Sequence, residues 1–196
     1  MILFQKPADL SAYISGQKAK KLRIGFVPTM GALHKGHISL LENAKQICDI
    51  VVCSIFVNPT QFNQSKDLET YPRNLGKDIR LLLEDSCDVL FHPNVEGIYG
   101  DDLSKDDTGD YGTFINLLEG ESRPGHFDGV VTVVRKLFEI VSPDEVYFGQ
   151  KDYQQCLVVT TLINRKFPNI HFNLCPIARE ESGLAMSSRN VRLNPR

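Results

Sequence analysis

The fold is decided by the stretch LRIGFVPTMGALHKGHISLLENAKQICDIVVCSIFV, residues 22–57. Its first part, residues 22–27, is an apolar run typical of a buried strand, and residues 38–47 repeat apolar side chains at the spacing of one helix face. Residues 49–57 are rich in β-branched side chains and predict a central strand. A strand, a helix and a second strand in this order are typical of a parallel sheet.

The remainder of the chain continues this alternation. Helices are predicted at residues 75–86, 129–141 and 152–167, and further strands at residues 88–93, 145–149 and 170–177. The fold class is therefore α/β, a Rossmann-like, doubly wound parallel sheet of about five strands with helices on both faces. The run TFINLL (113–118) is a candidate for an added edge strand. The segment 101–110, with five aspartates around Lys105, is interpreted as a solvated loop because its spacing fits no calcium loop.

Length and composition describe one globular domain. The chain has 196 residues, of which 42% are hydrophobic and 23% charged, so it can bury a core without a disulfide or metal. The formal net charge of −2 argues against a broad basic surface for nucleic acid. No apolar run approaches the roughly 18 residues of a membrane span, and the N-terminus lacks the layout of a signal peptide. The five cysteines include no C-x-x-C motif and are interpreted as reduced, buried thiols of a cytoplasmic protein.

Polar loops follow the predicted strands. Residues 28–37, 58–62, 149–155 and 178–190 come after four of the strands and are dense in glycine, histidine, lysine, glutamine, arginine and serine. The carboxyl ends of parallel strands share one edge of a sheet, and ligands bind there near the point where the strand order reverses. We therefore expect these loops to converge on one site.

The first of these loops carries two histidines at the start of a helix. Gly31 and Gly36 have the spacing of a phosphate-binding loop, but His37 stands where that motif needs a lysine, so the motif is absent. His34 and His37 instead lie one turn apart at a helix N-terminus, where unsatisfied N–H groups attract phosphate. Both imidazoles could donate hydrogen bonds to phosphate oxygens that gain charge in a transition state. Plainer interpretations stay open, namely exposed histidines or a helix cap, and a zinc pair would need a third ligand.

A later loop adds a cation and amides. Lys151 opens a predicted helix and can pair with phosphate, whereas Asp152 beside it is either a ligand contact or a charge that complements the helix dipole. Gln154 and Gln155 follow, and Gln61 lies in the loop after the second strand. Neutral amides suit a substrate with hydroxyls and a carboxylate, although exposed structural glutamines are an equal alternative.

The last loop holds hydroxyls and a guanidinium. Ser187, Ser188 and Arg189 are good ligands for a polyphosphate. Arg123 and His126 precede the helix predicted at 129–141, and for them a proline–glycine turn with incidental charges is an equal alternative.

Together these motifs resemble a known family. A His-x-Gly-His motif on the first helix and a serine-rich basic loop after the fifth strand are similar to the nucleotidyltransferase superfamily. Within it, five motifs resemble the pantoate–β-alanine ligases, also called pantothenate synthetases: PTMGALHKGH (28–37), FVNPTQF (56–62), RPGHFDGV (123–130), YFGQKDYQQ (147–155) and REESGLAMSSRN (179–190). The resemblance covers about residues 22–191 and departs at Lys35, where an acidic residue is common.

The resemblance implies the two-step reaction of a ligase whose substrates are pantoate, β-alanine and ATP. The carboxylate of pantoate attacks the α-phosphorus of ATP and releases pyrophosphate. The amine of β-alanine then attacks the acyl carbon of the pantoyl adenylate and releases AMP. Both reactants of the first step are anionic, so catalysis must neutralise charge and align them. Mg²⁺ is implied with ATP, held largely by water and phosphate oxygens.

The functional residues of the family transfer motif by motif. His34, His37, Lys151 and Arg189 are the implied catalytic residues; the family gives His37 an acid role, and charge stabilisation is the role favoured here. The implied ATP-binding residues are Met30, Gly31, Ala32, Leu33, His34, Lys35, Gly36, His37, Gly149, Gln150, Lys151, Asp152, Ala178, Met186, Ser187, Ser188 and Arg189.

Other contacts are implied in the same way. Asp152 and Gly149 would reach the ribose, and the backbone near Ala178 and Met186 would hold the adenine. The implied contacts of the other substrates are Gln61, Gln155, Met30 and Phe62. No residue is assigned as a direct protein ligand of Mg²⁺.

The resemblance also implies a homodimer and a domain organisation. Members of the family are longer and carry a smaller C-terminal domain that covers the site as a lid. Residues 1–196 are therefore expected to be the nucleotide- and pantoate-binding N-terminal domain without that lid. Two alternatives stay open: a nucleotidyltransferase of the same superfamily that acts on a phosphorylated substrate, and a non-catalytic nucleotide-binding module.

Overall fold

The structure is a computed structural model that describes residues 1–106, 108 and 111–193. Its strands are β1 (Ile2–Phe4), β2 (Ile24–Thr29), β3 (Ile50–Ile55), β4 (Val89–Phe91), β5 (Glu145–Gly149) and β6 (His171–Cys175). Its helices are α1 (Pro7–Ala19), α2 (Lys35–Lys45), α3 (Ser65–Glu69), α4 (Leu75–Glu84), α5 (Val95–Tyr99), α6 (Glu119–Ser122), α7 (His126–Val141) and α8 (Tyr153–Lys166). Short 3₁₀ turns are η1 (Pro59–Gln61), η2 (Thr113–Asn116), η3 (Gln150–Asp152) and η4 (Ser188–Arg192).

The six strands of the described residues form one parallel sheet in the order β1-β4-β3-β2-β5-β6. β2 pairs with β3 on one side and with β5 on the other, so the chain winds outward in both directions from β2. The strand order therefore reverses between β2 and β5, which is where ligands bind in open sheets of this type. The predicted doubly wound α/β fold is confirmed.

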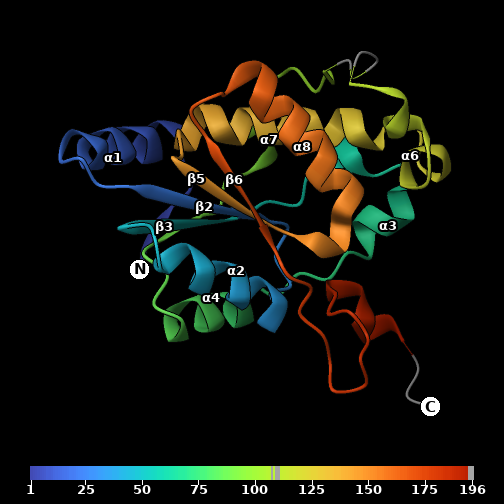
Figure 1. The fold of residues 1–196 in the computed structure, drawn as a ribbon, viewed down its shortest axis with the longest axis horizontal. Helices are drawn as coiled ribbons and strands as arrows, with labels where there is room; N and C mark the ends of the chain where they lie inside the picture. The colour runs from blue at the N-terminus through green and yellow to red at the C-terminus, as the bar shows by residue number, and fades with distance from the viewer. Residues whose placement is uncertain (107, 109–110, 194–196) are drawn as a thin grey trace.

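Helices cover both faces of the sheet (Figure 1). On one face lie α1, α7 and α8, and Leu10 of α1 and Leu162 of α8 share an apolar core with Phe26 of β2. On the other face lie α2 and α4, whose Leu41 and Leu82 belong to a second core. β3 is buried along its whole length inside the sheet, as its β-branched sequence predicts. None of the described helices is long and apolar enough to cross a membrane.

Several elements and one loop differ from the sequence prediction. Neither β1 nor α1 is predicted from the sequence, because β1 has three residues on the exposed edge of the sheet and α1 fully buries only two side chains. The helices α3, α5 and α6, of four or five residues each, are too short to show a helical period and are also missed. The prediction of an edge strand at 113–118 is wrong, since part of this run forms η2. Positive φ angles at Gly112 (112°) and Leu118 (50°) end any extended backbone on either side.

The acidic segment 101–110 lies partly outside the described residues. Residues 101–105 are exposed, as expected for a solvated loop. Asp106, however, pairs with Arg135 of α7 at 2.6 Å, and its backbone N–H donates to Thr132 of the same helix at 2.7 Å. The described part of the segment is therefore solvated at its start and held against α7 at its end.

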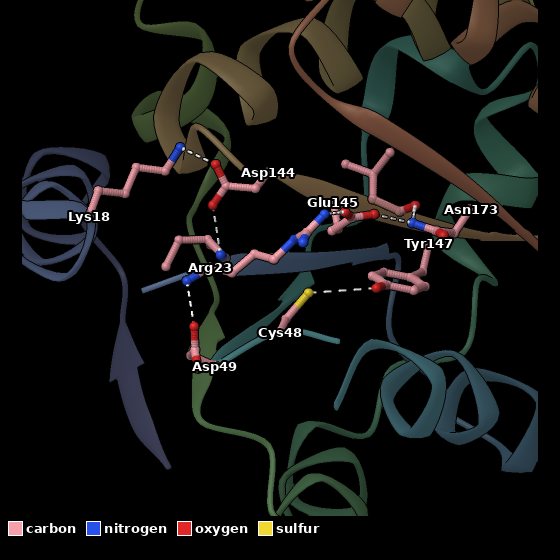
Figure 2. A network of polar contacts seen from close by, with 10 residues as sticks. Lys18, Arg23, Cys48, Asp49, Asp144, Glu145, Tyr147 and Asn173 are labelled. Atoms are coloured by element: carbon pink, nitrogen blue, oxygen red, sulfur yellow. Dashed lines mark hydrogen bonds and ion pairs between the residues drawn. The ribbon is translucent and has the colours of Figure 1, made fainter. Parts of the chain in front are cut away.

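Polar contacts tie the strands together at the amino end of the sheet (Figure 2). Asp144, just before β5, pairs with Lys18 of α1 at 2.9 Å. The buried Glu145 pairs with Arg23, which precedes β2, and accepts a hydrogen bond from Asn173 of β6 at 2.7 Å. These charged groups lie at the opposite end of the strands from the polar loops and hold the sheet together.

Tyr147 lies two residues beyond Glu145 along β5. Its hydroxyl lies 3.5 Å from the Cys48 sulfur, and Figure 2 shows the two side chains pointing toward each other. All five cysteines are free and buried, which confirms the prediction of buried thiols. The Tyr147 ring also lines the cavity described next.

Candidate active site

A cavity opens at the carboxyl ends of β2 and β5, where the strand order reverses. It brings together fourteen of the predicted site residues: Met30, His34, Gly36, His37, Gln61, Gly149, Lys151, Asp152, Gln155, Ala178, Met186, Ser187, Ser188 and Arg189. The convergence of the polar loops is therefore confirmed by the geometry.

Six predicted residues lie outside the lining of this cavity. Gly31 and Ala32 border a second cavity on the other side of the first loop. Leu33 is buried in the core formed with α2 and α4, while Lys35 and Gln150 are exposed. Phe62 packs edge-on against Tyr71, with the ring centroids 5.7 Å apart, and Tyr71 lines the cavity in its place.

The first loop is held in shape by a buried carboxylate that sequence reasoning misses. Asp78 of α4 is 1% exposed, and it accepts hydrogen bonds from the backbone N–H groups of Ala32 at 3.0 Å and Leu33 at 2.8 Å. Gly31 turns the chain here with φ +78°, and a side chain at this position would meet Asp78 at 3.1 Å. One available signal is that Asp78 interrupts the apolar face of an otherwise amphipathic helix.

The two histidines of the first loop form a reciprocal cap at the start of α2. The Nδ1 atom of His34 accepts the N–H of Gly36 at 3.1 Å, and Nδ1 of His37 accepts the N–H of His34 at 3.3 Å. The rings lie with their centroids 4.0 Å apart. Because a backbone N–H can only donate, each neutral ring carries its proton on Nε2. The helix-cap interpretation is thus correct, and the same contacts leave two Nε2–H donors for a ligand.

Gly36 is required by this arrangement. A Cβ atom at position 36 would lie 2.9 Å from both Cε1 and Nδ1 of His34, which is closer than real Cβ contacts come. The glycine therefore leaves room for the capping ring, which stands beside the cavity.

Both histidines are neutral at physiological pH. Burial lowers the pKa of His34, and the nearby charge of Lys151 lowers it further. Burial lowers the pKa of His37 to about 3, with smaller contributions from His34 and Lys151. In the ligand-free protein both rings are therefore uncharged, and they offer a ligand N–H groups and no positive charge.

Stability should consequently fall in acid. The pKa of His126, buried at the start of α7, is also lowered by burial, so three histidines stay neutral in the folded chain but take up protons near pH 6.5 once unfolded. Below that pH the unfolded state binds more protons, and the free energy of unfolding decreases as pH falls from 6.5 toward 3. For His37 alone, the pKa is about 3 in the folded chain and about 6.5 in the unfolded chain. This difference lowers the free energy of unfolding by up to about 2 kcal/mol between pH 7 and pH 5.

Urea unfolding at pH 7 and pH 5 measures this loss. His37→Asn, which can still cap the helix, should lose less stability between the two values than the unaltered chain does. An equal loss in both proteins would contradict the assignment, because carboxylates titrate identically in the two.

The expected phosphate cations are paired with carboxylates in the ligand-free protein. Lys151 Nζ lies 2.8 Å from Asp152, and an Arg189 nitrogen lies 2.9 Å from Asp67 of α3. The Arg189 guanidinium also stands over the Tyr71 ring, 5.4 Å from its centroid. Both cations line the cavity with these carboxylate partners.

The last loop is docked onto the first. Ser188 donates its hydroxyl to the carbonyl oxygen of Ala32 at 3.0 Å. Ser187 begins η4 by accepting the N–H of Arg189 at 3.3 Å. The loop that carries the serines and Arg189 is thereby attached to the loop that carries the histidines.

The glutamines occupy the other part of the site and have different environments. The Gln61 side chain is buried, and its Nε2 lies 2.9 Å from the Met30 sulfur. Gln155 lines the cavity, whereas Gln154 turns away to bond the carbonyl oxygens of Phe114 and Leu117, both at 2.7 Å. Gln154 is therefore a structural glutamine, one of the two alternatives that the sequence leaves open, whereas Gln155 is placed at the cavity.

The loop before α7 supports Gln61 from behind. The buried His126 donates from Nδ1 to the Gln61 carbonyl oxygen at 2.8 Å, and Arg123 donates to the same oxygen at 3.3 Å. Neither residue lines the cavity. Asn58 does line it, although sequence reasoning overlooks it; its position directly after an apolar strand is the available signal.

The described residues contain no group of three or more His, Cys, Asp or Glu side chains placed to hold a metal ion. Among the described lining residues, Asp152 alone carries a carboxylate. Any divalent cation here would therefore depend on oxygens that a ligand brings.

Comparison with known proteins gives a consistent result. The sequence matches the family described as pantoate-beta-alanine ligase over residues 2–196. It is 48% identical over 193 residues to the pantothenate synthetase of Porphyromonas gingivalis, covering 98% of this chain and 68% of the relative. A pantoate-beta-alanine ligase from Francisella tularensis, solved in complex with β-γ ATP and β-alanine, aligns with a TM-score of 0.94 and 46% identity over 99% of this chain and 74% of that chain. A pantothenate synthetase from Thermus thermophilus aligns with a TM-score of 0.92 and 44% identity, covering 100% of this chain and 68% of that one.

Proposed function

The chain belongs to the pantoate–β-alanine ligase family, and we propose that the cavity between β2 and β5 carries out the family's reaction through an adenylate of pantoate. The protein is a ligase that uses ATP to condense pantoate with β-alanine. One observation carries the adenylate mechanism: two N–H-donating imidazoles at a helix N-terminus line the same cavity as two paired cations and a buried glutamine.

The first step joins two anions, so charge decides its rate. A carboxylate oxygen of pantoate bonds to the α-phosphorus of ATP while the bond from that phosphorus to the pyrophosphate oxygen breaks. Negative charge grows on the α-phosphate oxygens in the transition state. The Nε2–H groups of His34 and His37, together with the N-terminus of α2, would donate to those oxygens without rearranging, because the reciprocal cap already fixes both rings.

The paired cations would hold the rest of the triphosphate. Lys151 and Arg189 are held by Asp152 and Asp67 in the ligand-free protein, and phosphate oxygens would replace these carboxylates as their partners. Release of Asp152 would leave its carboxylate free to accept from the ribose hydroxyls. Mg²⁺ would enter with ATP, held by phosphate oxygens and water, which suits a lining whose described part has a single carboxylate.

Pantoate would lie at the glutamine end of the cavity. Gln61 and Gln155 would bind its polar groups, and its geminal methyl groups would contact Met30 with Val130 and Val133 of α7, which also line the cavity. In the second step the β-alanine amine attacks the acyl carbon, an amide bond forms, and AMP leaves with the bonding electrons of the anhydride.

The same resemblance supports assignments beyond the reaction. Residues 1–196 would serve as the nucleotide- and pantoate-binding domain, and the assembly would be a homodimer. Five buried thiols without a disulfide support a reducing, cytoplasmic location.

Pyrophosphate release tests the mechanism directly. With Mg²⁺ and ATP present, adding pantoate without β-alanine should release about one equivalent of pyrophosphate and leave the adenylate bound, while AMP should appear only after β-alanine is added. Pyrophosphate release that needs a phosphorylated acceptor instead of pantoate would favour nucleotidyl transfer. The absence of pyrophosphate and of bound adenylate would favour a non-catalytic nucleotide-binding module.

A further inference from the structure

A buried group of polar side chains lies behind Gln61, outside the reaction described so far. Asn58 precedes η1 and is 1% exposed, and Tyr99, the last residue of α5, is 4% exposed. The Tyr99 hydroxyl donates to Oδ1 of Asn58 at 2.7 Å and lies 3.1 Å from the hydroxyl of Thr60. Asn58 lines the cavity, whereas Tyr99 does not.

The orientation of the Asn58 amide follows from which neighbours can donate. The backbone N–H of Thr60 can only donate, and it lies 3.3 Å from Oδ1. The carbonyl oxygen of Gly129 can only accept, and it lies 3.1 Å from Nδ2. Burial raises the pKa of Tyr99, so its hydroxyl keeps the proton that it donates to Oδ1. The Thr60 N–H and the Gly129 carbonyl oxygen therefore fix the NH₂ group of Asn58 away from Tyr99, and the Tyr99 hydroxyl, which could donate or accept, donates to Oδ1 in that orientation.

This orientation fixes the amide of Gln61 in turn. The second Nδ2 hydrogen bond of Asn58 goes to Oε1 of Gln61 at 3.1 Å. The Gln61 oxygen is thus already engaged, and its NH₂ group is the end that faces Met30 and the cavity. Gln155, in contrast, has no side-chain hydrogen bond that fixes its amide among the described contacts.

We propose that Tyr99 is a positioning residue for pantoate: acting through Asn58, it locks the Gln61 amide with N–H groups toward the substrate, so that this end of the site selects a hydrogen-bond acceptor such as a carboxylate or hydroxyl oxygen. The proposal rests on the proposed function in one respect, namely that Gln61 binds pantoate. It differs from a packing role, because removing the hydroxyl alone should change how the substrate is bound.

The hydroxyl can be removed with little other disturbance. The Tyr99 ring packs against Phe56, with centroids 6.3 Å apart, and Lys136 lies 5.3 Å from its centre. Tyr99→Phe keeps the ring and these contacts. In this variant Oδ1 of Asn58 still accepts from Thr60, so the hold of Asn58 on the Gln61 amide is weakened and not abolished.

The test is a double-mutant cycle read by calorimetric binding of pantoate in the presence of a non-hydrolysable ATP analogue. Tyr99→Phe should raise the Kd for pantoate about three- to tenfold, the scale of one neutral hydrogen bond, and leave the Kd for the analogue unchanged. In a Gln61→Ala background the same substitution should change the pantoate Kd less than about twofold, because the group through which it acts is gone.

Two further variants complete the design. Tyr111→Phe removes the hydroxyl of another tyrosine in the same apolar core, whose ring likewise lies under a cation, here Arg165, and should leave pantoate binding unchanged. Thr60→Val removes the second hydroxyl beside Oδ1 of Asn58 and should weaken pantoate about twofold, which provides a second measurement should Tyr99→Phe fold poorly.

The outcomes separate this proposal from the function on which it rests. If Gln61→Ala does not weaken pantoate, the proposed pantoate contact fails and the role of Tyr99 fails with it. If Gln61→Ala weakens pantoate but Tyr99→Phe does not, or if Tyr99→Phe acts equally in both backgrounds, the positioning role alone is overturned.

Discussion

Replacing His37 by alanine should slow formation of pantoyl adenylate at least about 100-fold while changing the Kd for ATP less than about threefold. The reason is that the His37 contact grows with the charge of the transition state. Its ring is neutral, with a pKa of about 3, and its Nδ1 is fixed by the His34 N–H, so Nε2–H is positioned before the reaction begins. Rapid-quench single turnovers with labelled ATP and pantoate measure the rate, and calorimetry measures the Kd.

The control is His171→Ala, which removes an exposed imidazole at the amino end of β6, at the opposite end of the strands from the cavity. It should leave both quantities unchanged. Equal losses of ATP affinity and of rate in His37→Ala would show that the contact serves ground-state binding. If the rate of adenylate formation by the unaltered protein fell as pH rose through a pKa near 6.5, a charged imidazole would instead be acting as an acid.

Replacing Asp78 by alanine should lower the free energy of unfolding by about 2–4 kcal/mol and reduce turnover about tenfold or more. Two backbone N–H groups, of Ala32 and Leu33, would lose their acceptor at a site where water enters poorly. The same loop holds Ser188 through the Ala32 carbonyl oxygen, so its relaxation would also loosen the loop that carries Arg189. Urea unfolding and steady-state kinetics measure the two effects.

Glu84→Ala is the matched control, because it removes an exposed carboxylate from the last turn of the same helix. It should change stability by less than about 0.5 kcal/mol and leave turnover intact. If Asp78→Ala lost stability but kept full turnover, the first loop would keep its active shape without the carboxylate, and Asp78 would be a folding residue only.

Much of the fold follows from patterns that act locally. The apolar runs that became β2, β3 and β5 are buried inside the sheet, where most side chains are apolar, so their sequence is diagnostic. β1 is not, because an exposed strand of three residues has no alternation to read. The run 113–118 has the composition of a strand, but its backbone is set by the positive φ angles at its two ends.

The residues of the candidate site likewise fall into those that local sequence patterns predict and those that they do not. Residues that follow strands, such as His34 and Lys151, can be predicted, because topology alone brings the carboxyl ends of β2 and β5 together. Residues that support them come from distant parts of the chain. Asp78 reaches the first loop from 45 residues away, and Tyr99 reaches Asn58 across 41 residues, so no local pattern connects them.

The reciprocal cap at the start of α2 explains why the motif His-x-Gly-His contains a glycine at position 36. A side chain at position 36 would begin with a Cβ atom 2.9 Å from the His34 ring, so the ring would have to shift to admit it. The imidazole rings of His34 and His37 therefore both begin helix α2 and line the cavity, so a substitution that alters one of these roles also alters the other. A variant with another residue at position 36 would have to move the His34 ring away from the N–H group that it caps, although both histidines would remain in its sequence.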